Sequence, residues 1–161
     1  MIDRSFIHAK TFAITDVKVY MGDIFVLDYL NGLYRFDFMK NQEVRITGRY
    51  DKDGFYKFNV YSNNLENELI VALANSHAVY EIEWYNRLSP ILINKYSLME
   101  HSNVKQVLLN DRYVIVQSTV NATDDQSAMY EIDYTWIFSK GSRTYANAYH
   151  IINHKDSNAQ L

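Results

Sequence analysis

The chain has 161 residues, of which 48% are hydrophobic and 22% charged, and its formal net charge is −3 at pH 7. This composition is typical of a globular protein with a hydrophobic core and excludes an intrinsically disordered chain. The small negative charge argues against nucleic-acid binding as the main function, because there is no excess of cations to displace phosphate counterions. No run reaches the roughly 18 apolar residues of a membrane-spanning helix, so we expect no membrane partner.

Cysteine is absent. The chain therefore has no disulfide, no thiolate zinc site and no cysteine nucleophile. The first ten residues carry charges and a histidine without a long apolar segment, which is not the pattern of a signal peptide. From these two observations we expect an intracellular protein, whose compartment the composition does not specify.

The first predicted strands are short and lie close together. Residues 6–12 resemble later outer strands, and we expect them to form an extra outer strand. A first four-stranded unit then spans about residues 15–50, with strands predicted at 17–20, 24–27, 33–38 and 44–50. The Asn31-Gly32 pair predicts a tight turn before the third of these strands, because both residues tolerate positive φ.

A second unit spans about residues 55–98, with strands predicted at 58–61, 69–73, 79–84 and 91–98. Its second strand, Leu69-Ile70-Val71-Ala72-Leu73, is a short continuous apolar run. Such runs are typical of strands that are buried on both faces. We therefore expect this strand to lie inside the protein.

A third unit spans about residues 103–152, with strands predicted at 104–108, 113–116, 129–134 and 143–152. We interpret residues 118–128 as the turn segment between its second and third strands. Residues 135–138 are unusually apolar for a turn, so Trp136 either extends the strand or packs on a neighbour. Residues 153–161 are polar and are expected to form a frayed tail.

The third strand of each unit carries nearly the same pattern of apolar, Tyr, charged, apolar, acidic and aromatic residues. Its copies are residues 33–38, 79–84 and 129–134, and their tyrosines stand 46 and 50 residues apart. Alternation with period two indicates strands, because successive side chains leave opposite faces. We expect the recurring acids, among them Glu81 and Asp133, to mark a solvated face. A four-stranded unit of about 40–50 residues has the period of a β-propeller blade.

The run from Gly22-Asp23-Ile24-Phe25-Val26-Leu27-Asp28 to Gly32-Leu33-Tyr34-Arg35-Phe36-Asp37 resembles blades of the β-propeller superfamily, including WD40-like repeats. The second and third units match in strand pattern alone. The resemblance implies an all-β, partial propeller-like fold of antiparallel four-stranded blades, over residues 1–152. The alternative is a single antiparallel barrel or sandwich. Three blades are too few to close a ring of about four to eight, so we expect a protein partner or self-association through open blade edges.

The predicted loops at one end of the blades supply the candidate binding residues. They are Asp28, Asn31, Asp51, Asp53, His77, His101, Asp124 and Asp125. Asp51-Lys52-Asp53-Gly54 resembles the calcium loop of integrin-type propellers, but Arg49 and Lys57 stand where further carboxylates belong. We therefore interpret it as a turn and predict no metal site.

No catalytic motif is recognisable, and no two histidines have the spacing of a helical metal-binding motif. We therefore predict neither catalytic residues nor a cofactor. The hypothesis from sequence is a non-catalytic interaction or scaffold module. The alternative is a fragment of a propeller enzyme or sugar-binding protein, whose site is completed by residues outside this chain.

Overall fold

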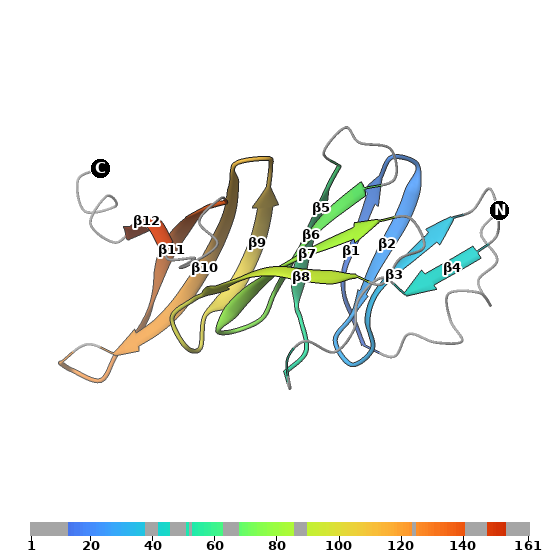
Figure 1. Ribbon diagram of the computed structural model, residues 1–161. Coiled ribbons are helices and arrows are strands. Elements are labelled where there is room, and N and C mark those ends of the chain that lie inside the picture. The colour runs from blue at the N-terminus through green and yellow to red at the C-terminus, as the bar shows by residue number, and fades with distance from the viewer. Residues whose placement is uncertain are drawn as a thin grey trace.

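Figure 1 shows the computed structural model of the chain. It describes residues 13–37, 42–45, 51, 53–62, 68–85, 90–123, 125–140 and 148–153. The expected outer strand at residues 6–12, and the tail from residue 154 onward, lie outside the described residues. Within them the chain forms twelve strands and no helix, arranged as three antiparallel sheets of four strands each.

Each sheet follows the order of the chain. The first sheet contains β1 (Ile14–Tyr20), β2 (Asp23–Asp28), β3 (Gly32–Asp37) and β4 (Gln42–Arg45). The second contains β5 (Lys57–Tyr61), β6 (Glu68–Ala74), β7 (Ala78–Tyr85) and β8 (Ile91–Ser97). The third contains β9 (Asn103–Leu109), β10 (Tyr113–Thr123), β11 (Met129–Ser139) and β12 (Ala148–Asn153).

The three sheets are stacked like successive blades (Figure 1), and none closes into a barrel, because each keeps two edge strands. Their first strands are neighbours, since β5 contacts both β1 and β9. This arrangement confirms the predicted all-β fold of four-stranded antiparallel units. It excludes the single barrel or sandwich that the strand pattern also allowed.

Two hydrophobic cores hold the stack together. The first lies between the first and second sheets and includes Phe25, Leu27, Phe58 and Ile82. The second lies between the second and third sheets. Its members include Ala72, Tyr96, Val116, Trp136 and Phe138.

Strand β6 contributes to both cores, with Val71 on one side and Ala72 on the other. Every residue of this strand is buried, as the apolar run predicted. The middle sheet is therefore the one that is covered on both faces.

The repeated tyrosines occupy corresponding positions. Tyr34, Tyr80 and Tyr130 all lie on the third strand of their sheet and are paired with Val26, Leu73 and Ala122 of the second strand. Tyr34 and Tyr80 are buried, but Tyr130 is only partly so. The difference arises because β10 and β11 are eleven residues long and carry Tyr130 beyond the core.

The predicted turn at residues 118–128 is wrong over its first half, because β10 continues to Thr123. Trp136 both extends the strand and packs on a neighbour. Strand β11 continues to Ser139, and the Trp136 side chain is buried in the second core. Strand β9 pairs with β10 only as far as Thr119, and β12 pairs with β11 only from Tyr134. The outer part of the β10–β11 hairpin therefore projects from the stack as a two-stranded arm (Figure 1).

Candidate functional site

Loops from all three sheets meet at one end of the stack, here called the loop end. It includes residues 29–31 after β2, residues 51 and 53–56 before β5, residues 75–77 after β6 and residues 98–102 before β9. Two backbone hydrogen bonds join the last two of these segments, from Leu98 N to His77 O at 2.8 Å and from Ser102 N to Ser76 O at 2.9 Å. The tip of the β10–β11 arm extends from the same end, because Thr119 of β10 is paired with Asn103 at the start of β9.

Two turns at the loop end are built in the same way. The Asp28 carboxylate accepts hydrogen bonds from the Leu30 and Asn31 amides, at 2.8 and 3.0 Å. The Asn75 side chain likewise accepts bonds from the amides two and three residues later, at 3.1 and 2.9 Å. Such side-chain caps favour a turn because they satisfy amides that no strand partner can reach. Asp28 is fully buried and is placed to shape its turn.

The most connected group of polar side chains at this end is the Asp51 cluster, defined as Asp51, Asp53, Asn75, His77 and Tyr80. Three donors converge on one carboxylate oxygen, Asp51 Oδ2. They are the Tyr80 hydroxyl at 2.5 Å, His77 Nε2 at 2.9 Å and Asn75 Nδ2 at 3.1 Å. The other oxygen, Oδ1, accepts the Asp53 amide at 3.1 Å. On the far side of the ring, His77 Nδ1 lies 3.7 Å from Asp53 Oδ2.

These contacts keep Asp51 ionised. Burial by itself would raise the pKa of its carboxyl, but the hydrogen bonds, of which that from Tyr80 is the largest, outweigh it and hold the pKa well below its usual range. The pKa of Tyr80 moves the other way. Burial raises it, and the hydrogen bond to Asp51 and the negative charge of that group raise it further. The pair is therefore a neutral phenol that donates to a carboxylate at neutral pH.

Close packing fixes the segment that carries Asp51. A Cβ atom at Gly54 would collide with the carbonyl oxygen and ring of Tyr29, so only glycine fits at this position. The Tyr29 ring in turn lies 4.9 Å from that of Tyr56, and Phe55 meets Tyr80 edge-on at 5.3 Å. The Asp51 segment is thus wedged between the loops of the first and second sheets.

The structure brings together three of the predicted loop residues, Asp51, Asp53 and His77. Asn31 lies in the neighbouring β2–β3 turn and is partly exposed. His101 is exposed at a positive φ of 61°, and Asp125 is exposed beside the arm tip. Asp124 lies outside the described residues.

Sequence reasoning missed two members of the Asp51 cluster. The repeat explains Tyr80 as a strand residue but indicates no role for its hydroxyl. Asn75 stands at the start of a predicted turn, but its side-chain amide depends on Asp51, which is 24 residues away. Turn composition could have indicated the Asn75 cap, whereas the contact between loops follows only from the stacking of strands.

Glu81 contradicts the prediction that the repeated acids mark a solvated face. It is 1% exposed and lies between the second and third sheets, because the middle sheet has no solvated face. Its carboxylate accepts hydrogen bonds from Asn94 at 2.9 Å and Tyr96 at 3.2 Å, and it forms an ion pair with Lys140 at 3.0 Å. The corresponding acids of the third sheet, Glu131 and Asp133, are exposed as expected.

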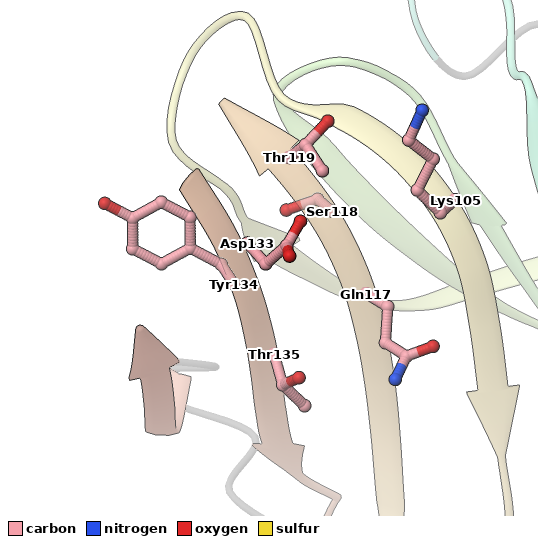
Figure 2. A pocket seen from close by; sticks show the side chains of 7 residues that line it. All are labelled: Lys105, Gln117, Ser118, Thr119, Asp133, Tyr134 and Thr135. Atoms are coloured by element: carbon pink, nitrogen blue, oxygen red, sulfur yellow. The ribbon is translucent and has the colours of Figure 1, made fainter. Parts of the chain in front are cut away.

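An open pocket lies on the outer face of the third sheet, with a cavity volume of about 390 Å³. Figure 2 shows its lining on β9, β10 and β11, where every lining residue has a polar side chain. The residues are Lys105, Gln117, Ser118, Thr119, Asp133, Tyr134 and Thr135. Gln117 is paired with Thr135, and Thr119 with Asp133, so these four side chains leave the same face of the sheet.

Among the described residues, Asp51, Asp53 and His77 are the group whose carboxylate and imidazole atoms lie near enough to share a metal ion, all within 4.8 Å of one another. The part of the chain that the structure describes contains no helix of the length and apolarity needed to cross a membrane. No protein-family model matches the chain. No curated protein matches it either.

Proposed function

We propose that the chain is a non-catalytic interaction module of propeller-like blades that associates head to tail with a second copy of itself. The single observation that carries this proposal is an apolar row left uncovered on β1. Val17 is 51% exposed and Val19 is 71% exposed. Both stand on the strand that corresponds to β5 and β9 in the other two sheets, where Phe58, Val60, Val104 and Val107 are buried.

The first strand of each sheet has a back, which faces away from the following sheet, and a front, which faces toward it. On β5 the back carries Phe58 and Val60, which are buried against the first sheet. On β9 the back carries Val104 and Val107, which are buried against the second sheet. In both strands the back is apolar and is covered by the preceding sheet.

The back of β1 is also apolar, but no preceding sheet covers it among the described residues. Val17 is paired with Val26 and Val19 with Ile24, so all four leave the same face of the first sheet. Val26 and Ile24 belong to a separate apolar cluster that takes no part in the core shared with the second sheet. Exposed valines on a strand surface of this kind are typical of an interface, because leaving them in water costs about 25 cal/mol per Å².

The front of the first strand in each of the first two sheets forms polar contacts with the next sheet. The front of β1 accepts the Phe58 amide on Asp16 at 3.2 Å and the Ser62 amide on the Tyr20 hydroxyl at 2.9 Å. The front of β5 donates from Asn59 Nδ2 to the Val107 carbonyl at 2.9 Å. The third sheet has no following sheet among the described residues, so its front is the surface left open to receive the β1 back of another copy.

A contact between the front of one copy and the back of the next is heterologous. Such contacts close into a ring or continue as a filament, depending on the rotation between copies. Two copies would stack six sheets, which lies within the range of about four to eight blades in propellers. We therefore favour a closed dimer.

The test is the mass in solution, measured by light scattering over a range of concentrations. We expect the wild-type chain to form a dimer and the double variant Val17→Lys/Val19→Lys to be a monomer, because two ammonium groups cannot be buried in an apolar contact. The control is Ile91→Lys/Ile93→Lys, which alters two exposed residues of the outer strand β8 and should leave the mass unchanged. A wild-type chain that is monomeric throughout would contradict the proposal.

A second candidate function is favoured by the pocket in Figure 2. Its amide, hydroxyl and carboxylate side chains would suit a sugar, in a fragment of a sugar-binding or enzymatic propeller completed by residues outside this chain. Thermal unfolding with calcium and with common sugars tests it. A clear rise in melting temperature that is lost in Thr135→Ala would favour this second function.

A further inference from the structure

We propose that Asp51, Asp53 and His77 form a binding site for a first-row transition-metal cation of the zinc class at the loop end. The three side chains come from two segments, the residues before β5 and the β6–β7 turn. Their ligand atoms lie within 4.8 Å of one another. Two carboxylates and one imidazole are a ligand set that Zn²⁺ accepts in proteins.

Access and exposure fit an ion that enters from solvent. The exposed fractions of the side chains are 8% for Asp51, 30% for His77 and 46% for Asp53. One ligand is thus anchored in the protein, while the other two face water. Three protein ligands leave at least one coordination position for water or for a group of a binding partner.

The residues behind the ligands are arranged as an outer shell that orients them. Asp51 Oδ2 is held by two side chains that are themselves buried, the Tyr80 hydroxyl at 2.5 Å and Asn75 Nδ2 at 3.1 Å. His77 is fixed by its backbone, since its amide donates to Asn75 Oδ1 at 3.1 Å and its carbonyl accepts the Leu98 amide at 2.8 Å. Hydrogen-bonded ligands of this kind are the usual support of a metal site.

The imidazole selects the class of cation. Calcium and magnesium prefer sets made entirely of oxygen ligands, whereas imidazole nitrogen suits zinc, cobalt and nickel. His77 Nε2 and Asp51 Oδ2 lie 2.9 Å apart as hydrogen-bond partners. A cation that binds the ring through Nε2 would replace the hydrogen bond to Asp51 Oδ2, the neutral ring would carry its one proton on Nδ1, and Tyr80 and Asn75 would continue to hold the carboxylate.

The experiment is calorimetric titration of the chelator-treated chain with Zn²⁺ alone, followed by Mg²⁺ and Ca²⁺. We expect one Zn²⁺ per chain, and much weaker binding of Mg²⁺ and Ca²⁺. The decisive variant is Asp53→Asn, because Asp53 is the most exposed ligand and its loss should leave the fold intact. Its affinity for Zn²⁺ should fall by at least about tenfold.

Two matched controls separate this site from adventitious zinc binding. Asp125→Asn removes another exposed aspartate and His101→Ala another exposed histidine, and both variants should bind Zn²⁺ like the wild type. Titration with Co²⁺ adds a second readout, since its visible absorption changes when an imidazole replaces water. Absence of Zn²⁺ binding by the wild type, or equal affinity in Asp53→Asn, would overturn the proposal. Neither readout depends on the oligomeric state, so this site and head-to-tail association can fail separately.

Discussion

The buried ion pair between Glu81 and Lys140 makes the sharpest stability prediction, through the variant Lys140→Met. The two charges are 3.0 Å apart, and the side chains are 1% and 12% exposed. At an effective dielectric constant of about 20, their direct attraction is about 5 kcal/mol, before the cost of removing both from water. Because methionine fills a similar volume, the substitution mainly leaves a buried carboxylate without its cation.

Lys140 makes two further contacts that methionine cannot replace. Its Nζ donates to the Asn110 carbonyl at 2.7 Å and lies 5.7 Å from the centre of the Tyr61 ring. The side chain therefore joins the third sheet to two strands of the second. Removing one partner of a buried pair typically costs about 3–5 kcal/mol. We place Lys140→Met near the lower end, about 3 kcal/mol, because Asn94 and Tyr96 still hydrogen-bond the Glu81 carboxylate.

The assay is urea unfolding at neutral pH, with the slope of the transition compared between variants to verify a common unfolded state. Glu81→Gln should lose less stability than Lys140→Met, because the ammonium that it leaves is more exposed than the carboxylate and still donates to the Asn110 carbonyl. The double variant Glu81→Gln/Lys140→Met should recover part of the loss, which gives a coupling energy of at least about 1 kcal/mol. A Lys140→Met chain within about 0.5 kcal/mol of the wild type would refute the reasoning, because a surface pair behaves in that way.

Two further predictions concern Tyr96 and Gly54. Burial raises the pKa of Tyr96, and the adjacent Glu81 carboxylate raises it further. The neutral phenol therefore stabilises the fold below the pKa of about 10 that tyrosine has in the unfolded chain. This contribution is lost as the pH rises toward the higher pKa of the folded state. The unfolding free energy of the wild type should therefore fall more steeply above about pH 10 than that of Tyr96→Phe, and parallel curves would contradict this. Gly54→Ala should lower the unfolding free energy by about 1–3 kcal/mol, because its Cβ would collide with the Tyr29 carbonyl. Gly22→Ala, with open space around the Cβ but a φ of 83°, should cost about 1 kcal/mol, and an equal cost at both glycines would argue against the collision.

The order of strands was predictable because it depends on local pattern. Alternation at residues 79–84 and a continuous apolar run at residues 69–73 correspond to β7 and β6. The grouping into units of four could also be inferred, since antiparallel neighbours joined by short turns follow chain order. The strand bounds of the third unit were harder to predict, because residues 118–128 contain turn formers although β10 continues to Thr123. Pairing across eleven residues with β11 decided the outcome there.

The candidate site was predictable in part. Asp51, Asp53 and His77 could be assigned to loops from turn composition, and the direction of the strands placed these loops at one end. Their convergence on one carboxylate oxygen could not be predicted, because Asp51 and His77 are 26 residues apart and a shift of any strand register would separate them.

By itself, the sequence determined the strands, their grouping into three units and which side chains along each strand are apolar. These properties depend on alternation and turn chemistry within a few residues. Only the tertiary structure decided which faces were covered. Glu81 and Glu131 belong to the same repeated motif, yet the first is buried beside Lys140 and the second lies in solvent. The physical reason is stacking, since a sheet between two others must bury both faces and pair any charge that it carries there.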